Sequence, residues 1–148
     1  MHEVRRILCR EEMDLIIREC DESFVMPPAI AKRDNYQEML DKFYNYSEFY
    51  VVEDTRKDIC GYAVLYANDY ENGQGWISLF CIKREKQGRG IGKLLMNRVI
   101  EAAKENGMST IRLEVWNANQ NAIGLYLKTG YIWDGRCTEY SSFMRLQI

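Results

Sequence analysis

Three glycines at alternate positions, Gly88, Gly90 and Gly92, separate a strand-like run from a strongly helical stretch, and they constrain the fold more than any other feature. Glycine adopts positive φ angles and allows close backbone approach, so successive N–H groups can point at one anion. The start of the following helix adds a partial positive charge. A pyrophosphate is therefore the natural occupant, with Arg89 and Lys93 placed for charged contacts. Taken in isolation, the same glycines would equally suit a plain turn between a strand and a helix.

Two common phosphate-binding motifs do not fit this segment. A dinucleotide motif G-x-G-x-x-G starting at Gly88 needs glycine where Lys93 stands, and one starting at Gly90 needs glycine at position 95, which is leucine. A Walker A motif needs glycine where Gln87 stands and serine or threonine where Leu94 stands. A nucleotide-binding module is therefore the weaker interpretation.

Apolar spacing along the chain predicts helices before and between short strands. Strands are expected at residues 49–53, 59–66, 75–83, 111–115, 131–133 and 140–146. Helices are expected at 11–20, at 34–46, from Gly90 to the stop signal Asn106-Gly107, and from the N-cap Asn119 to Gly130. The apolar stripe of the third helix consists of Ile91, Leu94, Leu95, Val99, Ala102 and Ala103. This order predicts a single α/β (α+β) domain over 1–148, with a mixed, mainly antiparallel central sheet flanked by helices.

Composition narrows the class of protein. Of 148 residues, 47% are apolar and 28% charged, which is typical of a folded globular domain. No apolar run is long enough for a membrane span and no signal-peptide core follows the N-terminus, so a cytoplasmic location is expected. The net charge of -2 argues against a nucleic-acid partner.

The cysteines and the lone histidine exclude several kinds of chemistry. The five cysteines are widely spaced without a Cys-x-x-Cys pair, which argues against both a metal site and a disulfide framework. The single histidine, His2, lies beside a terminus expected to be mobile, so a histidine base or a Ser-His-Asp triad is not expected. A catalytic base would have to be a carboxylate, a tyrosine, a lysine or water.

Residues around the glycine segment resemble the GNAT superfamily of acyl-CoA-dependent N-acyltransferases. The family's phosphate motif is glutamine or arginine, two variable residues, glycine, one variable residue, then glycine or alanine, and Gln87, Gly90 and Gly92 match it. A second family pattern follows in Leu113-Glu114-Val115, Asn119, Ala122, Leu125-Tyr126 and Gly130-Tyr131. The resemblance covers residues 76–133 well and implies acetyl-CoA as co-substrate. By resemblance, the residues that contact it are Phe80, Cys81 and Ile82 through their backbone, Gln87, Gly88, Arg89, Gly90, Ile91, Gly92, Lys93, Asn119 and Tyr126.

The resemblance also implies two catalytic residues. Tyr126 matches the tyrosine that protonates the leaving thiolate, although it would also fit as a core aromatic of the helix. Glu114 matches the carboxylate base of branches that acetylate protein N-terminal amines; the alternatives are a strand carboxylate paired with Arg112, and ordered water as the base. Asn119 suits an N-cap, a cofactor contact, or both. Cys81 is expected to be a small buried hydrophobe rather than a nucleophile, because no histidine is placed to activate it.

The predicted reaction is direct transfer of an acetyl group to a primary amine of a peptide or small molecule. The alternative is a noncatalytic acyl-CoA-binding or regulatory domain. The acceptor itself is not readable from the sequence, although the apolar loop 23–30 and Tyr140 are expected to shape its site. Pairing of sheet edges between chains would allow a homodimer.

Overall fold

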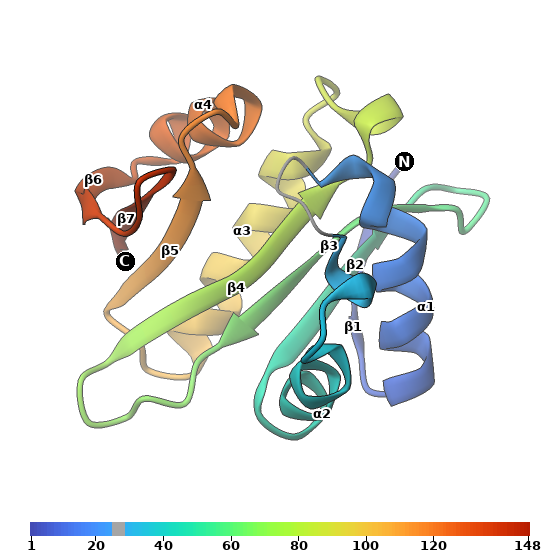
Figure 1. Cartoon of the computed structure of the whole chain (residues 1–148), viewed down its shortest axis with the longest axis horizontal. Coiled ribbons are helices and arrows are strands. Elements are labelled where there is room, and N and C mark those ends of the chain that lie inside the picture. Colours follow the sequence, from blue (N-terminus) through green and yellow to red (C-terminus); the bar gives the residue numbers. More distant parts are fainter. Residues whose placement is uncertain (25–28) are drawn as a thin grey trace.

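The computed structural model describes residues 1–24 and 29–148, which form a seven-stranded sheet with helices on both faces (Figure 1). The strands are β1 (Glu3–Ile7), β2 (Glu48–Glu53), β3 (Ile59–Tyr66), β4 (Gln74–Ile82), β5 (Thr110–Trp116), β6 (Ile132–Arg136) and β7 (Ser141–Gln147). The helices are α1 (Arg10–Cys20), α2 (Tyr36–Tyr46), α3 (Ile91–Glu105) and α4 (Gln120–Thr129), with 3-10 turns η1 (Asp21–Ser23), η2 (Ile30–Lys32) and η3 (Arg84–Lys86). The mixed, mainly antiparallel sheet predicted from the sequence is confirmed.

Strands β4 and β5 pair over only part of their length, which leaves one edge of β4 open inside the sheet. Strands β1 to β4 form an antiparallel meander, β5, β7 and β6 form a second antiparallel group, and a parallel β4–β5 pair joins them. A parallel pair needs a crossover connection, which α3 supplies. The pairing runs from Gln74 opposite Thr110 to Ile77 opposite Leu113, whereas β4 continues to Ile82. Beyond Ile77 the two strands diverge (Figure 1), so the second half of β4 has no strand on that side.

Each face of the sheet carries its own apolar core. Leu79 and Cys81 of β4 pack on the side of α1 and α2, whereas Phe80 and Ile82 pack on the side of α3 and α4. This alternation follows from the pleat of the strand, which sends successive side chains to opposite faces. Burying both faces fixes the register of β4, because a slip of one residue would exchange the two sets.

Helix α3 connects the two halves of the sheet and begins directly at the glycine segment. Its buried side chains are Ile91, Leu95, Met96, Val99, Ala102 and Ala103. The predicted stripe is correct except at one position, since Leu94 is 39% exposed and Met96 takes its place in the core. The apolar face is therefore rotated slightly from the predicted one, while the stop at Asn106 and Gly107 is confirmed.

The sequence interpretation missed the first strand and placed the glycines directly after β4. Strand β1 pairs with β2 from Glu3 opposite Glu53 to Ile7 opposite Phe49, so the chain is ordered almost from its first residue. Of this strand only Ile7 is fully buried, so its sequence lacks the alternation typical of a half-buried strand.

The turn η3 separates β4 from the glycines. No helix within 1–24 and 29–148 is long and apolar enough to cross a membrane.

Candidate active site

The open edge of β4 presents backbone groups that no strand uses. The Lys83 N–H donates to the Cys60 carbonyl of β3 at 2.8 Å, and neighbouring residues of a strand turn their backbone groups to opposite edges. The N–H and C=O of Phe80 and Ile82 therefore point away from β3, toward the edge that β5 has left. Cys81 turns its backbone toward β3 instead, so the backbone contact predicted for it is not available on this edge.

Next to this edge, the glycine segment forms an open cradle at the start of α3. Gly88 and Gly90 have φ angles of 78° and 79°, which side-chain-bearing residues rarely adopt. A Cβ added at either glycine would meet no atom of residues 1–24 or 29–148 within 4 Å, so these residues leave the space above the loop open. The first helical bond runs from the Leu94 N–H to the Gly90 carbonyl, which leaves the N–H groups of residues 91–93 without a partner inside the helix. An anion fits this arrangement.

The charged side chains of the cradle are free to meet an anion, whereas its glutamine is already engaged. Arg89 and Lys93 are exposed, and neither forms an ion pair with any residue in the described parts of the chain. The Gln87 side chain donates to the Ile82 carbonyl at 3.0 Å and accepts from Asn121 at 2.9 Å. Gln87 thus ties the end of β4 to the start of α4 rather than pointing into the cradle.

Gly92 has a different role from the two glycines before it. A Cβ at Gly92 would lie 3.1 Å from a methyl group of Leu125, which is tighter than ordinary contact. Its lack of a side chain lets α3 approach α4 closely. The predicted cradle therefore depends on Gly88 and Gly90, while Gly92 brings α4 near the open edge.

Tyr126 lies on α4 and packs toward the open half of β4. Its ring is 5% exposed and meets the ring of Phe80 edge-on, with centroids 6.0 Å apart. Burial raises the pKa of the Tyr126 phenol above its ordinary value, so the group stays protonated near neutral pH. No hydrogen bond to its hydroxyl comes from the residues that the structure describes. The structure thus places a protonated phenol beside Phe80.

Glu114 follows Leu113, the last residue of β5 that pairs with β4, and its side chain is exposed. Its carboxylate accepts a hydrogen bond from the Ser141 hydroxyl at 2.5 Å. Ser141 is 1% exposed, and its hydroxyl is also 2.8 Å from that of Thr138. Loss of solvent raises the pKa of the Cys137 thiol above its ordinary value, and the Glu114 carboxylate raises it further.

The pairing of Glu114 with Arg112 that the sequence allowed is wrong. Arg112 binds Asp134 instead, with Nε and Oδ2 2.9 Å apart, and its guanidinium lies 3.9 Å from the centre of the Phe143 ring. The side chain reaches across β7, over Phe143, to Asp134 on β6, which sequence spacing alone does not reveal. Glu114 has no cationic partner among the described residues.

Local geometry bears on two other residues of the sequence analysis, Asn119 and Cys81, and the cofactor contact of Asn119 stays a prediction. Asn119 caps α4, because its side-chain oxygen accepts a hydrogen bond from the Ala122 N–H at 3.3 Å. Cys81 is 5% exposed and its thiol faces the Cys20 carbonyl at 3.8 Å. Hydrogen bonding and burial raise the pKa of the Cys81 thiol far above its ordinary value, which disfavours the thiolate that a nucleophile would need.

The described ends of the apolar loop 23–30 are anchored close to the end of β4. Both carboxylate oxygens of Asp21 accept backbone N–H groups, from Ile30 at 3.0 Å and Ala31 at 2.9 Å. The Ser23 hydroxyl accepts the Arg84 N–H at 3.0 Å. The middle of the loop, 25–28, lies outside the described residues.

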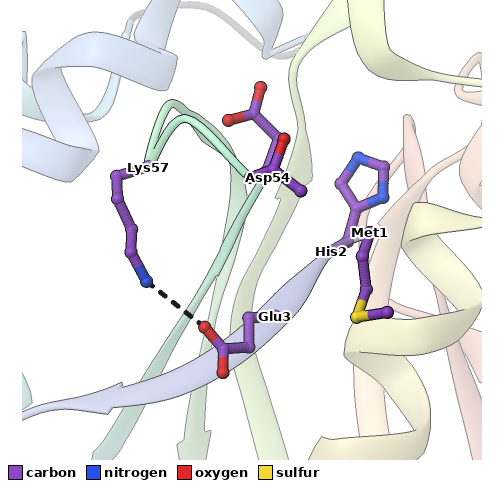
Figure 2. Close-up of a pocket in the computed structure, with 6 residues that line it drawn as sticks. Met1, His2, Glu3, Asp54 and Lys57 are labelled. Carbon is purple, nitrogen blue, oxygen red and sulfur yellow. Dashed lines mark hydrogen bonds and ion pairs between the residues drawn. The ribbon is translucent and has the colours of Figure 1, made fainter.

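His2 lies just before β1, which is three strands away from the open edge of β4. It lines a shallow hollow of about 230 Å³ with Met1, Glu3, Asp54, Thr55 and Lys57 (Figure 2). An ion pair between Glu3 and Lys57 at 3.3 Å spans this hollow. Strand β1 is three positions away from β4 in the sheet, so the hollow is separate from the candidate active site. Within 1–24 and 29–148, no group of three or more potential protein ligands is arranged to hold a metal ion.

The chain is similar to known proteins both in sequence and in fold. The model of the acetyltransferase (GNAT) family matches residues 11–131. A probable spermine N(1)-acetyltransferase of Bacillus subtilis subsp. natto is 31% identical over 84 residues, which make up 53% of this chain and 55% of that protein. The chain thus spans about half the length of the curated relatives it matches.

Solved structures share the whole fold. A protein of the GNAT family from Desulfovibrio desulfuricans superposes with a TM-score of 0.80 at 18% identity, covering 99% of both chains. The ribosomal-protein-S18-alanine N-acetyltransferase of Escherichia coli superposes with a TM-score of 0.77 at 15% identity, covering 100% of this chain and 94% of that one. At such identities the likeness shows the fold alone.

Proposed function

Because the chain belongs to the acetyltransferase (GNAT) family, we propose that it transfers an acetyl group from acetyl-CoA to a primary amine. The observation that carries this proposal is the early end of the β4–β5 pairing, which opens an edge of β4 beside the glycine cradle of α3. One place for an extended thioester arm and one for a pyrophosphate thus lie next to each other. The names of the relatives agree on the acceptor only in chemical class, since the one names spermine and the other an alanine of a ribosomal protein, both acetylated on nitrogen.

The residues of the site fit the two parts of acetyl-CoA. The N–H groups at the start of α3 and the side chains of Arg89 and Lys93, which pair with no acidic side chain in the described parts of the chain, suit the pyrophosphate. The outward N–H and C=O of Phe80 and the outward N–H of Ile82 suit the amide groups of the pantetheine arm and the thioester carbonyl, whereas the Ile82 carbonyl already accepts from Gln87. The thioester supplies the activated acetyl group, so the protein has to position it and manage protons.

The acceptor amine must lose a proton before it can attack. An ordinary alkyl ammonium has a pKa of about 10.4 and a terminal α-ammonium about 8, so both are mostly charged at neutral pH. In the proposed reaction Glu114 takes this proton. The neutral nitrogen then forms a bond to the thioester carbonyl carbon, the carbon–sulfur bond breaks with its electron pair on sulfur, and the products are an amide and coenzyme A.

Tyr126 is proposed to stabilise the departing sulfur. A thiol has an ordinary pKa of about 8.5, and burial raises that of the Tyr126 phenol above its usual value. Complete transfer of the phenol proton to sulfur is therefore uphill, while a hydrogen bond from the phenol to the developing thiolate is favourable. In this role Tyr126 donates a hydrogen bond and keeps its own proton. The proton that coenzyme A finally carries comes from the amine.

Replacing Tyr126 by phenylalanine is expected to lower kcat by about a hundredfold, because it removes this donor while keeping the ring. Steady-state coenzyme A release at saturating acetyl-CoA measures the loss. The matched control is Tyr131→Phe, a neighbouring buried tyrosine whose ring centroid is 5.5 Å away and whose hydroxyl faces the Met96 sulfur. Equal losses in both variants would indicate a packing effect and would remove Tyr126 from the mechanism.

The proposed function is tested first by thermal unfolding with and without acetyl-CoA, with ATP and NAD as controls. A ligand at 100 times its dissociation constant stabilises the folded state by about 2.7 kcal/mol, which raises Tm by several degrees for a domain of this size. A shift with acetyl-CoA alone supports the cradle, and release of coenzyme A with an amine present then tests transfer. Binding without release for any amine would leave a noncatalytic acyl-CoA-binding domain.

A further inference from the structure

An aromatic pair lies next to Glu114, on the face of β5 that is turned away from α3 and α4. Trp116 lies two residues after Glu114 on β5, so both side chains project from the same face. The Trp116 ring stacks on Tyr140, with centroids 5.4 Å apart and planes at 27°. Tyr140 is 57% exposed and Trp116 partly exposed. The opposite face of β5 holds Leu113 and Val115, which are buried against α3 and α4.

The carboxylate next to this pair is an uncompensated charge. Among the described residues, the hydroxyl of Ser141 is the one side-chain hydrogen-bond partner of Glu114, and this group is neutral. A buried hydroxyl with a fixed donor direction holds the carboxylate in place without cancelling its charge. Glu114 is therefore oriented and still open to a cation.

The other carboxylates nearby differ from Glu114. Asp134 is already shared by two guanidinium groups, with Arg112 at 2.9 Å and Arg145 at 3.8 Å. Glu139 lies in the exposed turn before Tyr140. A single oriented carboxylate beside a stacked indole and phenol suits one ammonium group attached to an apolar body, since cations and apolar groups both bind aromatic faces. A polyamine carries several ammonium groups, and besides Glu114 the acidic residue of β5 and β6 is Asp134, which is already paired with arginines.

We propose that Trp116, Tyr140 and Glu114 form the acceptor subsite, and that it selects a primary ammonium carried on an aromatic or apolar group over a polyamine. This inference rests on the proposed acetyl transfer and adds the class of acceptor. The amine nitrogen meets Glu114 at the point where β5 leaves β4, and the rest of the acceptor lies on the aromatic pair.

The test compares 2-phenylethylamine, ethanolamine and spermidine as acceptors, with coenzyme A release as the readout. The expected kcat/KM for 2-phenylethylamine exceeds those of the other two by about tenfold or more. Trp116→Leu and Tyr140→Leu are each expected to raise the KM for 2-phenylethylamine about tenfold, while the KM for acetyl-CoA stays unchanged. Because Tyr140 is largely exposed, its variant tests the subsite even if Trp116→Leu does not fold.

The matched control is Trp133→Leu. Trp133 is 50% exposed and pairs with Met144, whose side chain belongs to the core on the α3 and α4 side. The same substitution is thus made on the opposite face of the same sheet, and its KM for the amine should not change. Melting temperatures of all three variants show that they are folded.

The outcomes separate this inference from the proposed function. Acetylation that prefers spermidine, or that is indifferent to both aromatic substitutions, would overturn the aromatic subsite and leave the transferase intact. Absence of acetylation for every amine, despite a stabilising shift with acetyl-CoA, would overturn the transfer reaction and the subsite with it.

Discussion

Replacing Glu114 by glutamine is expected to lower kcat at neutral pH by about a hundredfold, with little change in affinity for acetyl-CoA. Glutamine keeps the shape of the side chain but cannot take a proton from the ammonium group. It can still accept the Ser141 hydrogen bond through its carbonyl oxygen, so the fold around it should be preserved. The loss therefore reports on proton removal.

The pH dependence of this variant gives the sharper measurement. Without a base, only the neutral amine reacts, and its fraction rises about tenfold per pH unit below the pKa of the amine. The rate of Glu114→Gln should thus rise steeply between pH 7 and 9, and that of the unmodified enzyme less steeply. Glu139→Gln, at a neighbouring exposed carboxylate, is the control for kcat. If Glu114→Gln turns over like the unmodified enzyme across this range, ordered water is the base.

Replacing Gly90 by alanine is expected to abolish most of the stabilisation that acetyl-CoA gives, measured as the shift in Tm. Gly90 caps α3 in a left-handed conformation with φ of 79°, and a side chain there costs about 1–2 kcal/mol. Relief of this strain would turn the first N–H groups of α3 away from a shared anion. The added methyl group would also project into the open space above the loop, where nothing lies within 4 Å.

The chain offers a close control for this substitution in Gly107. Gly107 follows the other end of α3, also has a φ of 79°, and an added Cβ would likewise meet nothing within 4 Å. Gly107→Ala should therefore carry a similar strain and a similar loss of stability. It should retain the full Tm shift with acetyl-CoA, because no free N–H groups gather there. Equal shifts in both variants would mean that the glycine segment is only a turn.

Much of this molecule was predictable from local patterns. The left-handed turn at Gly90, the apolar face of α3 and the cap at Asn119 each depend on residues within a few positions of one another. Strand β1 escaped prediction because it lies at an edge of the sheet and buries only Ile7 fully. Its place comes from pairing with β2, which is distant in sequence.

Some residues of the candidate site could likewise be found in the sequence, and others became apparent only in the structure. Tyr126 and Glu114 were identified by a family motif, but the motif does not say what surrounds them. Ser141 carries no sequence signal, since one serine in a C-terminal strand resembles any other, and Trp116 and Tyr140 become neighbours only through β5–β7 pairing. The open edge of β4 likewise follows from where β4 and β5 stop pairing.

The sequence by itself therefore determined the order of the elements after β1, the left-handed glycine turn before α3 and the residue types available for proton transfer, because these depend on backbone preferences and short-range spacing. Only the tertiary structure decided that Arg112 binds Asp134 and leaves Glu114 without a cation among the described residues. It also decided that Gln87 closes onto the end of β4. Such contacts join residues far apart in the chain. Several residues of the same chemical type could serve as partners, and the strand register and the length of the side chain decide which one does.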